Sequence, residues 1–198
     1  MAPINKRFSG LLPVVIDIET GGLNHETDAL LELAAITLNY NNSFELTISK
    51  LFEWKINPFE GSNIEQQALG VNGIVLDSSG RNSIAVDESS CIDELFQIVN
   101  KEVKNSRCDQ AILVGHNPSL DLNFLNAAVK RLGTKNSPFH LFRTIDTATL
   151  GVLAYQNIKL ALASKAAGFS WEEEKAHTAK YDVTKSAELF CQVFNQWK

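Results

Sequence analysis

The segment VVIDIET, residues 14–20, constrains the fold of this chain more than any other part of the sequence. Apolar residues lead into Asp17, and Glu19 follows after one more isoleucine. Residues two apart on a strand point to the same face, so these carboxylates are expected to stand side by side. Like charges that close raise each other's pKa, and burying one unpaired costs several kcal/mol. An arginine, a lysine or a metal ion must therefore meet the pair.

The composition predicts one globular domain over residues 1–198, with residues 1–12 as an N-terminal extension. No run of about 18 apolar residues predicts a membrane span, and the first residues lack the features of a signal peptide. The three cysteines, Cys91, Cys108 and Cys191, form no CxxC pair. This pattern predicts reduced thiols in the cytoplasm and argues against a zinc site.

The net charge of −5 argues weakly against nucleic-acid binding, because domains that bind nucleic acids are usually basic. Two bound divalent cations would bring that charge to about −1. The bulk charge therefore excludes little.

Hydrophobic periodicity predicts a mixed α/β domain: three antiparallel strands, then parallel strands, with helices on both faces of the sheet. The third strand alternates with period two, which predicts one shared apolar face for Phe44, Leu46, Ile48, Phe52, Trp54 and Ile56. Strands are expected over residues 13–18, 29–40, 44–56, 111–115 and 141–145, and helices over 64–69, 89–103, 119–132, 147–154, 159–167 and 178–195.

Five chemically suited residues fall at the predicted strand ends and helix starts. In α/β sheets, sites form beyond the carboxyl ends of parallel strands. Asp17 and Glu19 end the first strand, and Asp121 lies in the first turn of the helix after the fourth. The last helix carries Asp182, with His177 five residues earlier. We expect the fold to bring these residues together.

Each acid also has a purely structural interpretation. Asp121 could simply favour the helix dipole, and for Asp146 we prefer capping of the helix that starts next to it. His177 could be a solvated loop histidine, and Asp182 could lie on a polar helix face. The pair on the first strand is hardest to explain this way, since no neighbouring strand offers an obvious arginine or lysine.

The spacing of His177 and Asp182 separates their roles. Five helical positions would place them about 140° apart, so a shared site requires His177 to lie on the loop before the helix. A histidine on a polar loop suits a general base better than a rigid metal ligand.

Hard oxygen ligands without cysteine favour Mg²⁺ or Mn²⁺ over zinc. Two such ions about 4 Å apart can clamp the attacking and leaving oxygens of a phosphodiester. Asp17, on a rigid strand, is the natural bridge between them, and His177 would deprotonate the attacking water.

Three segments, DIETGGL, HNPSLD and HTAKYD, resemble the three motifs of the DEDDh family of 3′→5′ exonucleases. The resemblance implies a ribonuclease H-like fold. It also implies two Mg²⁺ ions, held by Asp17, Glu19, Asp121 and Asp182, with His177 as the catalytic base.

Within that family the chain is most similar to the ribonuclease T group, over about residues 13–197, through DALLELAAITL, SPFHLFRTIDTATL and LFCQVFNQWK. This resemblance implies a homodimer that trims the 3′ ends of tRNA and other stable RNAs and also acts on single-stranded DNA 3′ ends. Basic residues would hold the RNA backbone, although an ordinary solvated surface is the alternative for each. The candidates are Arg7, Lys104, Arg107, Lys130, Arg131 and Lys135.

The substrate-binding positions depart from that group. Where it places aromatic residues around the terminal bases, this chain has Leu23, Val71 and Leu120, and only Phe142 is aromatic. Gln67 stands where the group has a glutamate that reads the base. Stacking contributes roughly 1–3 kcal/mol per base, so we expect a weaker grip or an altered terminal-base preference.

Three functions compete at this stage. The first is a metal-dependent 3′→5′ exoribonuclease, and the second is a DNA proofreading or overhang-trimming exonuclease with the same site. The third is a nucleic-acid-binding module without catalysis, which would have no need to hold buried like charges together.

Overall fold

The computed structural model describes residues 3–77 and 79–197. The strands are β1 Leu11–Thr20, β2 Leu30–Tyr40, β3 Leu46–Lys55, β4 Gln110–Gly115 and β5 Phe139–Asp146. The helices are α1 Ile4–Arg7, α2 Gln66–Asn72, α3 Ser79–Asn82, α4 Glu88–Asn105, α5 Ser119–Leu132, α6 Thr147–Tyr155, α7 Leu160–Ala166 and α8 Ala179–Gln196, with a 3₁₀ turn, η1, at Glu173–Lys175.

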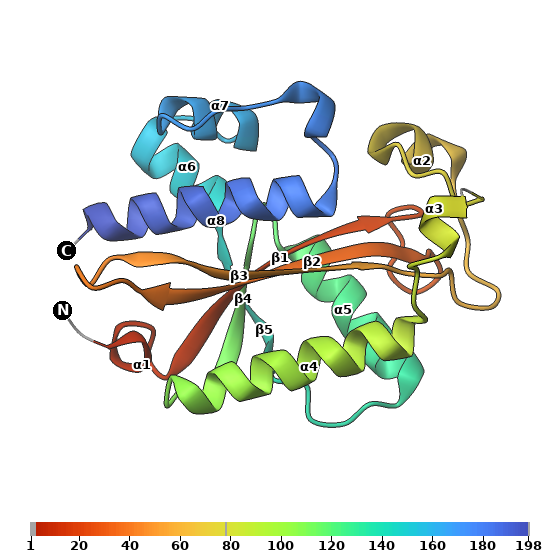
Figure 1. Cartoon of the computed structure of the whole chain (residues 1–198), viewed down its shortest axis with the longest axis horizontal. Helices are drawn as coiled ribbons and strands as arrows, with labels where there is room; N and C mark the ends of the chain where they lie inside the picture. Colours follow the sequence, from red (N-terminus) through yellow and green to blue (C-terminus); the bar gives the residue numbers. More distant parts are fainter. Residues whose placement is uncertain (1–2, 78, 198) are drawn as a thin grey trace.

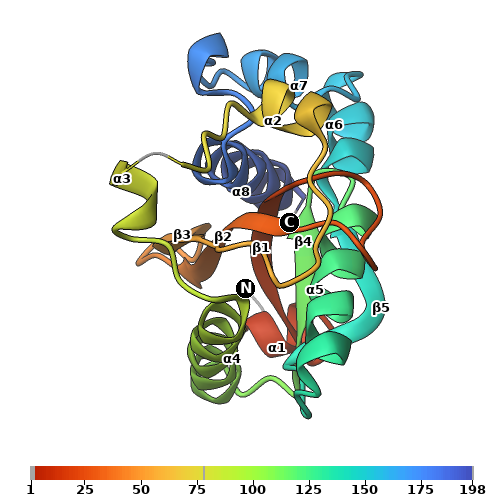
Figure 2. The ribbon, with the colours of Figure 1, turned by 90° about the vertical axis from the view of Figure 1, so that its right-hand side faces the viewer.

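The strands form one mixed sheet in the order β3-β2-β1-β4-β5. β1 pairs antiparallel with β2 and parallel with β4, while β2–β3 is antiparallel and β4–β5 is parallel. Helices α6, α7 and α8 lie on one side of the sheet, and α4 and α5 lie on the other (Figures 1 and 2). The predicted mixed α/β architecture with helices on both faces is confirmed.

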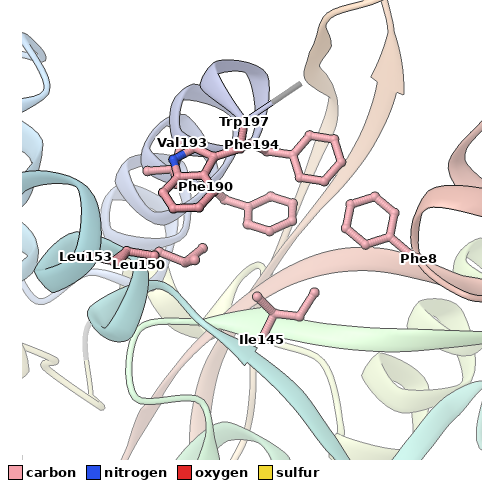
Figure 3. Close-up of a pocket in the computed structure, with 8 residues that line it drawn as sticks. All are labelled: Phe8, Ile145, Leu150, Leu153, Phe190, Val193, Phe194 and Trp197. Carbon is pink, nitrogen blue, oxygen red and sulfur yellow. The ribbon is translucent and has the colours of Figure 1, made fainter. Parts of the chain in front are cut away.

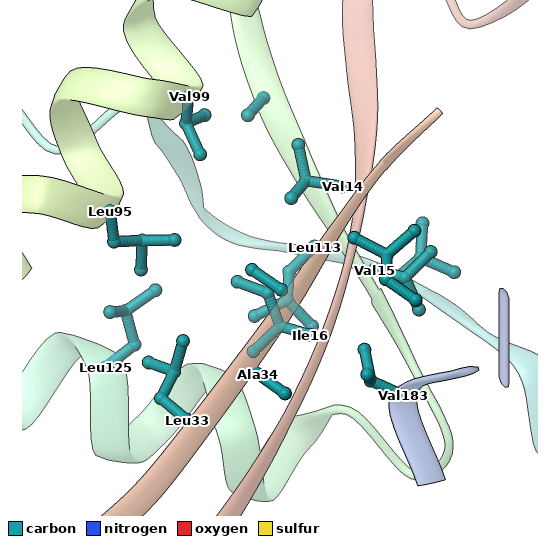
Figure 4. Close-up of a cluster of buried hydrophobic side chains, with 14 of the residues drawn as sticks. Val14, Val15, Ile16, Leu33, Ala34, Leu95, Val99, Leu113, Leu125 and Val183 are labelled. Atoms are coloured by element: carbon teal, nitrogen blue, oxygen red, sulfur yellow. The ribbon is translucent and has the colours of Figure 1, made fainter. Parts of the chain in front are cut away.

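The core fixes which face each residue of β1 occupies. In Figure 4, Ile16 lies on the side of Leu95 from α4, whereas Val15 lies beside Val183 from α8. Because side chains alternate along a strand, Asp17 and Glu19 share the face of Val15. The two carboxylates therefore emerge on the α8 side of the sheet.

The predicted apolar face of β3 is wrong in part. Leu46, Trp54 and Ile56 are buried, but Phe44 and Ile48 are exposed. The register between β2 and β3 shifts next to Leu38, where β3 holds one extra residue. Such a bulge breaks the alternation, so Leu46 and Ile48 do not share a face with Trp54, and Phe44 lies in the turn before β3.

Three short elements, α1, α3 and η1, were not predicted. Each has four residues or fewer, which is too few for a hydrophobic period to show. β5 is longer than predicted, and its register with β4 is interrupted between Ala111 and Leu113.

The N-terminal segment packs onto the domain from Ile4 onward, whereas residues 1–2 of the predicted extension lie outside the described part. Leu12 belongs to β1 and is buried, and Leu11 is half-buried. The Phe8 ring stacks on Phe194, with ring centroids 4.7 Å apart. Within residues 3–77 and 79–197, no helix is long and apolar enough to cross a membrane.

Candidate active site

Three acids meet above the carboxyl end of β1. One carboxylate oxygen from each of Asp17, Glu19 and Asp182 lies within 4.8 Å of the others. The two strand residues face α8, and Asp182 projects from the first turn of that helix. The structure therefore brings these three predicted ligands together, although 162 residues of chain lie between Glu19 and Asp182.

Asp121 lies beside this group but not within it. It is 6% exposed, in the first turn of α5, and its Oδ1 accepts a hydrogen bond from the backbone N–H of Ile18 at 3.1 Å. The main body of α5 packs on the face of the sheet opposite α8 (Figure 2), and Asp121 belongs to the first turn of that helix. Its charge still raises the pKa of both Asp17 and Glu19.

The protein itself does little to offset the negative charge of these acids. Burial, followed by the charges of Asp121, Asp182 and Glu19, raises the pKa of Asp17 well above its usual value. Burial and neighbouring carboxylates raise the pKa of Glu19 to about 8, and burial raises that of Asp121 to about 7. Burial also raises the pKa of Asp182. These shifts are the expected result of gathering like charges in a desolvated place.

Two basic side chains lie near Asp17 and Glu19, but both pair with a different acid, Glu32. Glu32 on β2 stands opposite Glu19 in the sheet register. Lys55 of β3 pairs with Glu32 at 2.7 Å, and Arg81 of α3 lies 3.7 Å from the same oxygen. The charge of Glu32 adds to the rise in the pKa of Glu19, so these cations leave the cluster acidic.

The donor set fits a divalent cation. Asp182 Oδ1 is buried and has no hydrogen-bond partner among the described residues. A buried carboxylate oxygen without a partner costs free energy unless a positive charge meets it. Three convergent carboxylates with no sulfur ligand match the oxygen coordination that Mg²⁺ and Mn²⁺ prefer.

His177 stands before α8 on the predicted loop. Its backbone N–H donates to Asp182 Oδ2 at 3.1 Å, and its φ of 60° lies in the left-handed region, which histidine tolerates better than most residues. The residue is exposed, on the loop directly before the helix that carries Asp182. This placement leaves the ring accessible to a substrate.

An open groove of about 810 Å³ contains Asp17, Asp182 and His177. Its other side includes His116, whose Nε2 meets the carbonyl of Ile158 at 2.9 Å. The groove is continuous with the three-acid group, so a phosphodiester lying in it would be within reach of both the acids and His177.

Asp146 serves the structural role that we preferred. Its side chain accepts hydrogen bonds from the backbone N–H groups of Ala148 and Thr149 and caps α6. These bonds, together with those from Thr149 Oγ1 and Asn117, outweigh burial and lower its pKa.

A second pocket of about 310 Å³ adjoins the acids on the other side and includes Glu19. Four of the five predicted substrate-binding residues line it: Leu23, Gln67, Val71 and Leu120. Leu23 is 78% exposed, so it rises from the pocket rim instead of filling the core. The fifth residue, Phe142, is 73% exposed on β5 and lies outside this pocket.

The predicted RNA-backbone residues do not form one surface. Lys104 lies in the last turn of α4 and Arg107 follows that helix, where the carbonyl of Arg107 accepts a hydrogen bond from Asn5 of α1. Lys130 lies near the other end of β1, where it pairs with Glu26 at 3.2 Å. Lys135 is exposed beyond α5.

Two of these basic residues have structural partners. Arg7 donates to the carbonyls of Phe194 and Trp197 at the end of α8 and stacks on the Phe194 ring. Arg131 makes two hydrogen bonds to the buried Glu88, at 3.0 and 2.7 Å. Both side chains are held to the fold itself.

Sequence reasoning missed Asn72, which lines the second pocket beside Glu19. Asn72-Gly73 is a typical helix-end pair. That pattern accounts for Asn72 by itself and does not indicate that the residue lies next to the acids. It also missed Asp28, which is 1% exposed and accepts bonds from Asn24, Thr27 and Asn63. Asp28 thereby orders the loop that presents Leu23.

Comparisons with known proteins identify the family and the fold of this chain. The family model RNase_T, described as Exonuclease, matches residues 14–190. The structure of E. coli Exonuclease I in complex with a dT13 oligonucleotide is similar at a TM-score of 0.67 and 14% identity, covering 92% of this chain and 41% of that one. The structure described as 3′-end specific recognition of histone mRNA stem-loop by 3′-exonuclease reaches 0.70 at 16% identity, covering 93% and 64%.

A third similar structure is Exonuclease I from Methylocaldum szegediense, with a TM-score of 0.69 and 14% identity over 94% of this chain and 41% of that one. This chain therefore spans about two fifths of the length of both Exonuclease I proteins. At these identities the likeness concerns the fold.

Proposed function

The chain belongs to the exonuclease family whose model matches residues 14–190 and has the ribonuclease H-like fold of that family, and from this premise we propose that it is a metal-dependent 3′→5′ exoribonuclease. We propose further that it is of the ribonuclease T type and trims the 3′ ends of tRNA and other stable RNAs. It would also act on single-stranded DNA 3′ ends.

One observation carries this proposal: three convergent carboxylates border both the open groove and the second pocket, which is lined by Leu23, Val71 and Leu120 and is called the apolar pocket from here on. The groove gives a phosphodiester access to the acids, and the pocket offers an end site for one nucleotide. A chain end that enters the pocket places its last phosphodiester at the acids, which is the geometry of exonucleolytic cleavage.

Each residue then has a role. Asp17, Glu19 and Asp182, with Asp121 beside them, would hold two Mg²⁺ ions, and Mn²⁺ would substitute. Divalent cations held there bring the attacking and leaving oxygens of a phosphodiester together and offset the charge that develops. His177 would accept the proton of the attacking water, since its exposed ring stands on the loop next to Asp182.

The pocket supports a tolerant choice of terminal base. Leu23, Val71 and Leu120 offer aliphatic surface, and the Gln67 amide both donates and accepts hydrogen bonds. Such an amide can pair with any base edge, whereas a glutamate can only accept. We therefore expect little discrimination among terminal bases.

A homodimer is supported by an apolar cavity of about 230 Å³ near the end of α8 (Figure 3). Leu153 and Trp197, which line it, are 60% and 59% exposed. A second copy of the chain would cover this exposed apolar surface. The cavity is lined by Phe8, Ile145, Leu150, Leu153, Phe190, Val193, Phe194 and Trp197. Light scattering of wild type and Leu153→Asp tests this: a dimer that becomes a monomer is expected, and a monomeric wild type would refute it.

A cytoplasmic location is supported by the cysteines. Cys91, Cys108 and Cys191 are all free, and burial raises the pKa of each thiol. Free thiols persist in reducing compartments.

The decisive experiment is a gel assay with purified protein and Mg²⁺. The substrate is a 5′-labelled hairpin with a 3′ tail of about four nucleotides, made as RNA and as DNA, with the last base varied. Shortening from the 3′ end that stalls near the duplex is expected, faster on RNA. Faster cleavage of DNA would favour the overhang-trimming enzyme, and binding of the tail without cleavage would favour the non-catalytic module.

A further inference from the structure

Helix α2 is tied at both ends to the residues that directly follow Glu19. At its start, the backbone N–H of Glu65 donates to the carbonyl of Gly21 at 2.7 Å. At its end, Nδ2 of Asn72 donates to the carbonyl of Thr20 at 3.2 Å. Figures 1 and 2 show α2 above the sheet and apart from the two long helices. The position of α2 is therefore linked to the end of β1 through these two bonds.

The Asn72 side chain joins the end of α2 to the end of β1. It is buried, with 8% exposed, and its Oδ1 accepts the backbone N–H of Ile74 at 3.1 Å, which fixes the turn after α2. Its Nδ2 donates to the carbonyl of Thr20, the residue that follows Glu19. Asn72 and Glu19 also line the same pocket, where the amide works against the rise in the pKa of the Glu19 carboxyl.

The same helix carries the wall of the apolar pocket. Gln67 and Val71 are four residues apart, so they lie on one face of α2, and both line the pocket. Asn72 follows Val71 directly. A shift of α2 that a bound nucleotide causes at Val71 would therefore move the amide that holds the Thr20 carbonyl next to Glu19.

We propose that Asn72 is a positioning residue that couples occupancy of the apolar pocket to the alignment of Glu19 in the acidic site. A nucleotide in the pocket would press on Gln67 and Val71 and fix α2. The fixed helix would hold the Asn72 amide, and through it the Glu19 carboxylate, in the position that metal binding requires. This inference rests on the proposed function, because it treats the pocket as the end site for the substrate.

The alternative is that Asn72 only closes the turn after α2. The isosteric variant Asn72→Asp keeps an oxygen for the N–H of Ile74, removes both side-chain donors and adds a negative charge. Asn72→Ala removes the donors and the oxygen without adding charge, so an effect that both variants share comes from the lost donors. Gln66→Ala, on the same helix but outside the pocket, is the matched control.

We expect Asn72→Asp and Asn72→Ala to lower kcat by roughly 10–100-fold, as is usual when a partner of a metal ligand is lost, with KM changed much less. The Mg²⁺ or Mn²⁺ concentration that gives half of the metal-induced rise in Tm should increase by a similar factor. Gln66→Ala should match wild type in both measurements. Wild-type behaviour of Asn72→Asp would overturn the proposal, since only the turn would then matter.

A double-mutant cycle tests the coupling itself. Val71→Ala should lower kcat in the wild-type background but change it less than about twofold in the Asn72→Asp background, because the link to Glu19 is already broken. If the effects of the two substitutions on kcat multiply in the double variant, the pocket and Glu19 act independently, and the proposal is overturned. If wild type cleaves neither RNA nor DNA, the proposed function fails instead, and the metal titration still decides whether Asn72 positions Glu19.

Discussion

Replacing Glu19 by glutamine should stabilise the metal-free protein at alkaline pH while weakening its response to metal. In the folded protein, burial and neighbouring carboxylates raise the pKa of Glu19 from 4.5 to about 8. The folded state thus holds this proton more tightly than the unfolded state does. The corresponding stability is present below about pH 4.5 and is lost as the pH rises through about 8.

The size of this loss follows from the shift. A change from 4.5 to about 8 corresponds to at most about 5 kcal/mol of unfolding free energy, shared among the coupled acids. Glutamine has the same shape and carries no charge, so Glu19→Gln avoids the loss. Even half of that amount would raise Tm by roughly 5–10 °C for a domain of this size.

Metal should narrow this difference in stability. Wild type gains about 2.7 kcal/mol when the free metal is 100-fold above its Kd, whereas the variant has lost one ligand and gains less. Thermal melts at about pH 5 and pH 8.5, with EDTA or with Mg²⁺, measure both effects. Glu60→Gln, at an exposed acid, is the control and should follow wild type. A variant less stable than wild type at pH 8.5 in EDTA, or one equally stabilised by Mg²⁺, would refute the reasoning.

Three further predictions concern single residues. Asp17→Asn should abolish cleavage with the fold intact, because this acid lies at the centre of the cluster; activity near wild type, with an unchanged circular dichroism spectrum, would contradict the site. His177→Asn, which keeps a residue that tolerates the left-handed backbone, should lower kcat by about 10²–10⁴-fold yet leave the metal-induced rise in Tm unchanged. Asp146→Ala should lower the unfolding free energy by about 1–2 kcal/mol through loss of the α6 cap, measured by urea denaturation, and an unchanged midpoint would argue against capping.

The long elements followed from local pattern. The helix predicted over residues 119–132 is α5, with Gly133 in the left-handed conformation that ends it. The strand predicted over 111–115 is β4, one residue longer at its start. These segments have a strong apolar period or a strong stop residue. The bulge in β3 and the turn η1 have neither an apolar period nor a stop residue. The bulge is defined by the pairing of β3 with β2, and η1 is too short to show a period.

For the candidate site, the sequence by itself predicted which side chains would carry the chemistry, and it determined that Asp17 and Glu19 share one face, because strand alternation is local. Only the tertiary structure decided that this face meets the first turn of α8, where Asp182 lies. It also decided that Lys55 and Arg81 pair with Glu32, leaving the cluster acidic, and that Asn72 lines the same pocket as Glu19. These contacts join residues that are far apart in the chain, and they depend on how helices pack on the sheet, which no local period encodes.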